Sequence, residues 1–136
     1  MRIKYIITLL LMLTGLVIQA QKLEMQSDGI MRLSKIEVYP EYLDEYLQYA
    51  LEVGEVSLQT EPGVLTMYPV ADKDNPCNIT ILETYASEEA YKDHIASPHF
   101  RKYKQGTLHM VKTLILTDVT PLNPNNQLLN IIKTKE

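Results

Sequence analysis

The amino-acid sequence predicts an α+β fold: a ferredoxin-like, split β-α-β sandwich in which helices cover one face of a four-stranded antiparallel sheet. The first observation behind this prediction is the order of the hydrophobic patterns along the chain. They are typical of strand, helix, strand, strand, helix, helix and strand, in that order. The second is a first strand with apolar residues on both faces, as expected inside a sheet. Helices on one face leave the other face bare, so we expect two copies to pair as a dimeric α+β barrel.

A proline separates the first strand from the first helix. Residues 30–39 predict the strand, and Pro40 ends it. Proline at the first helical position, with acidic residues in the opening turns, predicts a helix that ends before Glu61. Apolar residues spaced by three and four predict its inward face, which contains Leu43, Leu47, Ala50, Gly54 and Leu58, flanked by Tyr46 and Val53.

A turn and a hairpin follow this helix. Pro62 and Gly63 match the second and third positions of a type II turn. Residues 64–71 predict the second strand, and Pro69 within it indicates a bulge or the edge of the sheet. Turn-forming residues then lead into residues 78–85, which predict the partner strand of the hairpin.

Two serines predict the starts of the remaining helices. Ser87 precedes a helix whose inward face contains Ala90, Tyr91, His94 and Ile95. Ser97, followed by proline, caps a further helical segment whose inward side contains Phe100, Tyr103 and Thr107. Residues 110–119 predict the last strand.

The first 20 residues have the pattern of a secretory signal peptide. Arg2 and Lys4 precede an apolar run of 14 residues, Tyr5 to Ile18, and Ala20 provides a small residue for cleavage. The run is shorter than the roughly 17–25 residues that span a bilayer, so cleavage is favoured over a retained anchor. No cysteine lies near the cleavage point, which excludes a lipoprotein anchor. We therefore expect a secreted or periplasmic bacterial protein, with no stable membrane anchor after cleavage.

Cleavage would leave 136 − 20 = 116 residues, enough for one domain. The formal net charge would change from −4 to −6, because two of the 13 basic residues lie in the signal and 11 − 17 = −6. An acidic domain argues against nucleic acid as a partner. Cys77 is the only cysteine, so there is no intrachain disulfide and no cysteine-based zinc site. The expected divisions are a signal peptide (1–20), a leader (21–29), the folded domain (30–119) and a C-terminal tail (120–136).

Sequence motifs for common cofactors and for serine hydrolysis are missing. The five glycines do not form a dinucleotide or phosphate loop, and no serine lies in a Gly-x-Ser-x-Gly turn. The histidines, His94, His99 and His109, lack metal-binding spacing, since Pro98 breaks the helix between the first two. His99 lies in the first turn of a helix, where a cation is disfavoured, so we interpret it as neutral and structural. We expect no cofactor and no metal ion.

Candidate site residues lie on the third strand and the following helix. Glu83 and Tyr85 are two residues apart, so they share a sheet face with Ile79 and Ile81. A carboxylate in an apolar row indicates either a salt bridge at a strand end or a cavity in which it orients a substrate or a histidine. His94, on the inward helix face, is either a core histidine or a proton acceptor at the mouth of a cavity.

Several segments, in this order, resemble the antibiotic biosynthesis monooxygenase superfamily. They are Glu61-Pro62-Gly63-Val64, the hairpin, Leu82-Glu83-Thr84-Tyr85, the stretch from Ala90 to His94, and Ser97-Pro98-His99-Phe100. The resemblance covers residues 30 to about 119 and is to the small quinol monooxygenase type. It implies a homodimer that oxidises a quinol-like or polyphenolic small molecule with O2, without flavin or metal.

The resemblance also implies roles for individual residues. His94 would be the base or an orienting group, and Glu83 would set its tautomer or hold a substrate hydroxyl. Tyr85 would be a cavity wall and hydrogen-bond donor. Ser34 and Tyr68 would be further substrate-binding residues on the first and second strands.

Two branches of the superfamily fit this sequence poorly. The haem-degrading branch has a tryptophan near the position of Tyr85 and a haem-ligating histidine where this chain has Tyr103-Lys104. The branch that isomerises phosphorylated sugars acts in the cytoplasm, and the first strand offers only Arg32 and Lys35 as cations. The alternatives that stay open are such an isomerase and a non-catalytic small-molecule-binding or stress-response barrel of the same fold.

Overall fold

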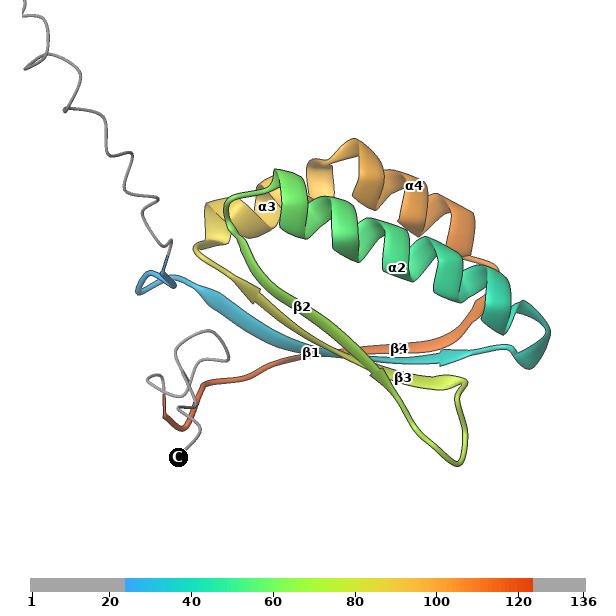
Figure 1. The fold of residues 1–136 in the computed structure, drawn as a ribbon. Helices are drawn as coiled ribbons and strands as arrows, with labels where there is room; N and C mark the ends of the chain where they lie inside the picture. Colours follow the sequence, from blue (N-terminus) through green and yellow to red (C-terminus); the bar gives the residue numbers. More distant parts are fainter. Residues whose placement is uncertain (1–23, 124–136) are drawn as a thin grey trace, which may run out of the picture.

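The computed structural model describes residues 24–123 (Figure 1). The expected signal peptide, residues 1–20, lies outside the described residues, as do positions 21–23 and 124–136. No helix within residues 24–123 combines the length and the hydropathy needed to cross a bilayer. The described part includes the whole of the domain predicted at residues 30–119.

The elements follow the predicted order. The strands are β1 (Ile30–Val38), β2 (Val64–Ala71), β3 (Asn78–Tyr85) and β4 (Val111–Asp118). The helices are η1 (Pro40–Tyr42), which is a single 3-10 turn, α2 (Leu43–Thr60), α3 (Glu88–Ala96) and α4 (Pro98–Thr107). The helix predicted to start at Pro40 therefore begins with a tighter turn and becomes α-helical three residues later.

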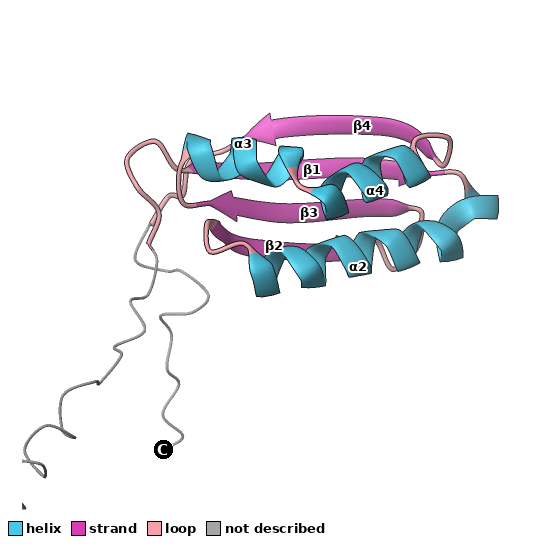
Figure 2. Cartoon of the chain, turned by 90° about the horizontal axis from the view of Figure 1, so that it is seen from above, coloured by secondary structure: helices cyan, strands magenta, loops and turns pink. Residues whose placement is uncertain are grey.

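The four strands form one antiparallel sheet with the order β2-β3-β1-β4. Helices α2, α3 and α4 all lie on the same face of this sheet (Figures 1 and 2). Strand β1 is internal, as its apolar pattern predicted, and Pro69 lies in the edge strand β2, where a missing N–H is tolerated. The predicted α+β, ferredoxin-like fold is confirmed.

Serine caps start both α3 and α4, as predicted. The Ser87 side chain accepts a hydrogen bond from the backbone N–H of Ala90 at 3.1 Å. The Ser97 side chain accepts one from the backbone N–H of Phe100 at 3.2 Å. Ser97 thus ends α3 and starts α4, so the chain changes direction between two neighbouring short helices.

The inward face of α2 agrees with the predicted one where Leu43, Leu47 and Ala50 pack against the core, and differs toward the end of the helix. The buried residues of the helix are Tyr46, Val53 and Ser57. Leu58, predicted to face inward, is 47% exposed. The stripe of buried side chains is therefore centred one position away from the leucines, on a tyrosine and a serine that hydropathy ranks lower.

The turn before β2 is not the predicted type II turn. That turn needs a positive φ at Gly63, and no described glycine has one. The turn is closed by the N–H of Val64, which donates to the carbonyl of Glu61 at 3.1 Å. Glycine is needed here because a Cβ atom at position 63 would lie 2.4 Å from the Cβ of Ala90. Gly63 therefore lets the end of α2 approach α3 closely.

The hydrophobic core lies toward one end of the helix-covered face. Its buried members are Ile36, Val38, Tyr46, Ile79 and Met110. Along the same face, Ile36 is paired with Ile79, and Ser34 is paired with Ile81 one step further along β1. The residues on this face thus change from apolar to polar toward the start of β1.

Candidate functional site

A cavity of about 510 Å³ lies between the sheet and the helices. Its volume is in the range of small-molecule pockets, and most of its lining side chains are apolar. Four of the predicted site residues line it: Ser34, Glu83, Tyr85 and His94. Strand alternation explains the first three, since Ser34 shares the helix-covered face with Ile36 on β1, and Glu83 and Tyr85 share it with Ile79 on β3.

Glu83 is the centre of the polar floor of this cavity. Its Oε1 accepts a hydrogen bond from the Ser34 hydroxyl at 2.5 Å, and its Oε2 accepts one from the Tyr85 hydroxyl at 2.8 Å. Two hydroxyl donors on the two oxygens suit an ionised carboxylate, which only accepts. Each oxygen keeps a further lone pair that a ligand hydroxyl can use.

Tyr85 and Tyr103, which line the cavity, and Tyr46 beside Tyr103 are held in their protonated form. Burial, followed by the negative charge of Glu83 and its hydrogen bond, raises the pKa of Tyr85 well above its ordinary value of 10.0. Burial also raises the pKa of Tyr46, whose hydroxyl lies 2.7 Å from that of Tyr103, and the pKa of Tyr103. These phenols can donate hydrogen bonds at neutral pH but cannot act as bases.

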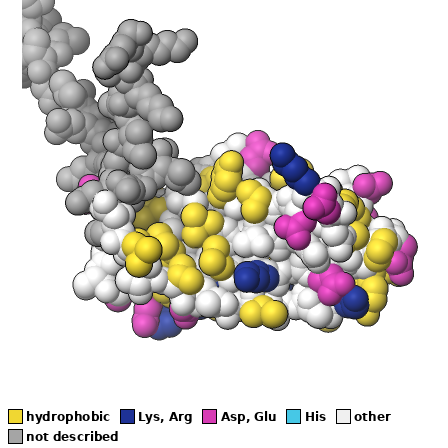
Figure 3. Space-filling model, turned by 90° about the horizontal axis from the view of Figure 1, so that it is seen from below, with side chains coloured by type: hydrophobic (Ala, Val, Ile, Leu, Met, Phe, Trp, Pro, Cys, Tyr) yellow, Lys and Arg dark blue, Asp and Glu magenta, His cyan; other side chains and the backbone are white. Residues whose placement is uncertain are grey.

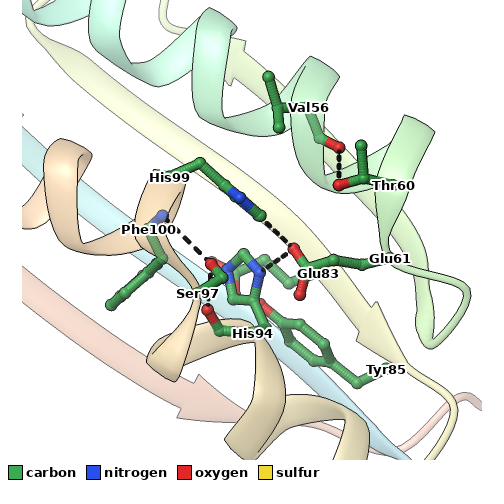
Figure 4. A network of polar contacts seen from close by, with 9 residues as sticks. All are labelled: Val56, Thr60, Glu61, Glu83, Tyr85, His94, Ser97, His99 and Phe100. Atoms are coloured by element: carbon green, nitrogen blue, oxygen red, sulfur yellow. Dashed lines mark hydrogen bonds and ion pairs between the residues drawn. The ribbon is translucent and has the colours of Figure 1, made fainter.

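His94 is paired with Glu61 and not with Glu83, for which the resemblance implied this pairing as one of two roles. Its Nδ1 lies 2.9 Å from Oε2 of Glu61, and Nε2 of His99 lies 2.6 Å from the same oxygen (Figure 4). The ring of His94 is 2% exposed. Because an ionised carboxylate only accepts hydrogen bonds, both ring nitrogens that face Glu61 carry a hydrogen.

Glu61 is ionised in this arrangement. Burial alone would raise its pKa, but the hydrogen bonds from His94 and His99 outweigh burial and lower the pKa below its ordinary value of 4.5. A negative charge beside Nδ1 stabilises the imidazolium that forms when the ring accepts a proton at its other nitrogen.

The second nitrogen of His94 is the one left for a ligand. Nε2 makes no hydrogen bond to any of residues 24–123, while the ring lines the cavity beside Tyr85 and Phe100. In the neutral ring with hydrogen on Nδ1, Nε2 is a proton acceptor. The pair of Glu61 and His94 therefore has the geometry of an oriented general base.

Tyr68 does not belong to this site, contrary to the prediction. It lies on the open face of the sheet and is 58% exposed, whereas its neighbours Met67 and Pro69 line the cavity. The register of β2 shifts between Val64 and Thr66, and alternation beyond this bulge turns Tyr68 outward.

Two cations, Arg32 and the exposed Lys104, line the cavity. Arg32 lines it, with Nε 2.6 Å from the Asp118 carboxylate and its guanidinium 4.7 Å from the centre of the Tyr91 ring. The hydrogen bond to Asp118 raises the pKa of Arg32 further above its ordinary value. Lys35, the other cation considered on this strand, is exposed.

Glu61 and His99 were not predicted as site residues, since Glu61 appeared only in a segment that carries the family resemblance and His99 was interpreted as structural. They lie 33 and 5 residues from His94 along the chain, and the Ser97-Pro98 break hides the relation between the two histidines. A helix break with a histidine on each side was the one available signal. Identifying the carboxylate required knowing that the end of α2 approaches α3.

Comparison with known proteins supports this assignment of the fold. The sequence profile described as "Antibiotic biosynthesis monooxygenase" matches residues 29–106. A Bacteroides thetaiotaomicron protein named for the same family is 54% identical, with a TM-score of 0.73 over 74% of this chain and 96% of that one. A Lactobacillus acidophilus protein named as a monooxygenase is 30% identical, with a TM-score of 0.67 over 71% of this chain and 46% of that one.

A more distant Caulobacter crescentus structure has 20% identity and a TM-score of 0.65 over 71% of this chain and 92% of that one, which supports the fold alone. None of these names states a substrate. A comparison with curated proteins found no match.

Proposed function

Because the chain belongs to the antibiotic biosynthesis monooxygenase family, we propose that it oxidises a quinol-like or polyphenolic molecule with O2, without a cofactor. The observation that carries this proposal is the cavity that contains an oriented histidine beside a polar floor. Nδ1 of His94 is held by Glu61, and Nε2 is left for a proton from the substrate.

The reaction needs few groups from the protein. A quinol that loses a proton becomes electron-rich enough to pass electrons to O2 directly. One oxygen atom then enters the ring, the other leaves as water, and the quinol supplies all four electrons, so that quinol and O2 give a hydroxyquinone and water. The protein has to bind the ring, accept the first proton and stabilise the anion.

The residues divide these tasks. His94 accepts the proton at Nε2, and Glu61 is a positioning residue that stabilises the resulting imidazolium. Glu83 accepts a hydrogen bond from a second substrate hydroxyl through a lone pair that Ser34 and Tyr85 leave unused. The apolar lining of the cavity surrounds the ring.

Oxygen uptake tests this proposal. With a panel of quinols, we expect uptake by the wild-type protein and by the His109→Gln control, whose histidine is exposed and packs on Tyr42 away from the cavity. His94→Gln should reduce kcat by about 10²-fold or more, as loss of a general base does. Absence of uptake with every quinol, together with measurable quinol binding, would favour the non-catalytic small-molecule-binding alternative.

The bare face of the sheet supports a homodimer as part of the same proposal. Cross-strand pairing places Tyr68, Leu82 and Leu33 in one row of this face, and Val70, Thr80, Lys35 and Ile115 in the next. Tyr68, Val70 and Ile115 are among the exposed large hydrophobic residues. Hydrophobic side chains gather on this face in Figure 3.

Sedimentation equilibrium at micromolar concentration tests the dimer. We expect twice the chain mass for the wild type and for the control Leu108→Lys, an exposed leucine next to the helices. Ile115→Lys should shift the protein toward the monomer, because a cation would be buried in the interface. A monomeric, folded wild type contradicts the homodimer.

The export of the protein is also a proposal. It rests on the charged start, the short apolar run and the small residue at Ala20. N-terminal sequencing of the protein from the periplasmic or secreted fraction should begin at Gln21. Recovery of chains that all retain Met1 contradicts cleavage.

A further inference from the structure

Three metal-ligating side chains meet where α2, α3 and α4 come together. They are Glu61, His94 and His99, and one ligand atom from each lies within 4.8 Å of the other two. Their side chains are 15%, 3% and 20% exposed, respectively. The cluster is therefore mostly shielded from water, unlike the acidic groups that gather on protein surfaces.

The backbone fixes the relative positions of the three residues. Glu61 follows the last turn of α2, where Gly63 allows close contact with α3. His94 lies in the last turn of α3, and His99 is the second residue of α4. Between them, Ser97 caps α4 and donates to the His94 carbonyl at 2.7 Å, so the two histidines keep their relative orientation.

We propose that Glu61, His94 and His99 form a binding site for a divalent transition-metal ion such as Zn²⁺. Two imidazoles and one carboxylate are typical ligands of zinc and its neighbours, whereas Mg²⁺ and Ca²⁺ prefer oxygen ligands alone. The ion would take the place of the two hydrogens that now point at Oε2 of Glu61. Water would complete its coordination.

The present distances are close to those that an ion requires. The two nitrogens lie 2.9 Å and 2.6 Å from Oε2. Ligands at about 2.0–2.1 Å from a tetrahedral ion are about 3.3 Å apart, so these two sides of the triangle have to lengthen by about half an ångström, while the two nitrogens, which lie within 4.8 Å of each other, would take the same spacing. Rotation of the Glu61 side chain at the end of its helix can supply this movement.

A buried hydroxyl beside the cluster is a second observation. Ser57, one turn before Glu61, is fully buried, and its Oγ makes no hydrogen bond of ordinary geometry to residues 24–123. It lies close enough to Glu61 to contribute to the lowering of that pKa. Buried hydroxyls without a partner are uncommon, and the Glu61 carboxylate is the acceptor nearest to hand, so Ser57 would hold this carboxylate in place when it binds an ion.

Metal binding would also change what His94 can do, a consequence that rests on the proposed function. Coordination through Nδ1 leaves the proton of the neutral ring on Nε2. Nε2 then donates a hydrogen bond into the cavity and no longer accepts a proton. The metal ion would therefore inhibit the monooxygenase reaction.

Calorimetric titration with Zn²⁺ alone, after EDTA treatment and dialysis, tests the site. We expect one ion per chain, with affinity reduced at least about tenfold in Glu61→Gln and in His99→Gln and unchanged in His109→Gln. Thermal unfolding without metal shows which variants are folded, and Zn²⁺ should raise the Tm of the wild type. If Glu61→Gln does not fold, the Zn²⁺ affinity of His99→Gln, at the rim of the cluster, still tests the site.

Lack of saturable Zn²⁺ binding, or equal affinity in wild type and in both ligand variants, overturns the metal site. The two proposals fail separately. Zn²⁺ binding without oxygen uptake by the metal-free protein contradicts the proposed function alone. If the protein takes up oxygen but Zn²⁺ neither binds to it nor inhibits the uptake, the metal site alone is contradicted.

Discussion

Oε2 of Glu61 lies 2.9 Å from Nδ1 of His94, although 33 residues separate the two in the sequence. This contact links the end of α2 to the end of α3 and decides which nitrogen of the histidine faces the cavity. The carboxylate that orients the histidine is thus separate from Glu83, the carboxylate on the cavity floor. Variants of the two carboxylates should consequently have different effects.

Glu61→Gln should reduce kcat by about 10²-fold with little change in KM, measured without metal and with EDTA present. Glutamine keeps the size of the side chain but removes the charge that stabilises the His94 imidazolium. Nitrogen-15 NMR of the histidine should show a smaller fraction of the tautomer with hydrogen on Nδ1. Glu52→Gln, at an exposed ion pair with Lys102, is the matched control. An unchanged kcat would contradict the orienting role.

Glu83→Gln should instead raise KM about tenfold, with a smaller effect on kcat. The amide cannot accept from both Ser34 and Tyr85 on its two ends, and it loses the charge that binds a substrate hydroxyl. Steady-state oxygen uptake measures both constants. Glu37→Gln, whose carboxylate pairs with Lys112, is the control. A fall in kcat alone would assign Glu83 to the chemical step.

Gly63→Ala should destabilise the fold by about 1–3 kcal/mol, as expected for overpacking against Ala90. Gly54→Ala is the control, because its new Cβ would meet only the Met67 side chain at 3.8 Å, and alanine favours the helix. Urea unfolding measures both. The double variant Gly63→Ala with Ala90→Gly should recover part of the loss, and equal effects of the two single glycine variants would refute the close contact.

Ser97→Ala should reduce both stability and activity, whereas Ser87→Ala should reduce stability alone. Each loses an N-terminal cap worth about 1 kcal/mol. Only Ser97 also donates to the His94 carbonyl and sets the angle between the two short helices. Unfolding curves and kcat for the two variants separate these effects. Equal activity in both would show that the helix junction does not position His94.

Alkaline pH should destabilise the protein through its buried phenols. The folded-state pKa of Tyr46 lies above the unfolded value of 10.0, so its contribution is complete below pH 10 and is lost as pH rises further. Each such tyrosine costs about 1.4 kcal/mol of unfolding free energy per pH unit above 10. Urea unfolding between pH 9 and 11 should give a shallower slope for Tyr46→Phe. If the free energy of unfolding falls equally steeply with pH in the wild type and in Tyr46→Phe, Tyr46 does not contribute to the pH dependence.

Local patterns were sufficient to predict the fold. Both serine caps, the edge strand with Pro69 and the internal strand β1 depend on residues close together in the sequence or on alternation within one strand. The expected face of α2 was wrong only at its end, because hydropathy favours Leu58, while packing buries Ser57. Tertiary contacts can therefore shift the buried face of a helix by one residue from the face that hydropathy predicts.

The site was predictable only where it depends on one strand. Alternation alone places Glu83 and Tyr85 on the same face. A bulge between Val64 and Thr66 reverses this rule for Tyr68, whereas the sequence indicated a bulge only as an alternative for Pro69. The pairing of His94 with Glu61 depends on the close approach of two helices. Gly63 permits this approach because it has no Cβ atom, not because it adopts a positive φ.

The negative charge on the cavity floor has a consequence for selectivity. A phenolic acid that brings its own carboxylate next to Glu83 would face repulsion in a poorly hydrated space, because the guanidinium of Arg32 is already paired with Asp118 and Lys104, the other cation of the lining, is exposed. Neutral phenols meet no such barrier. The protein would thus discriminate against aromatic acids by charge, before the shape of the ring is tested.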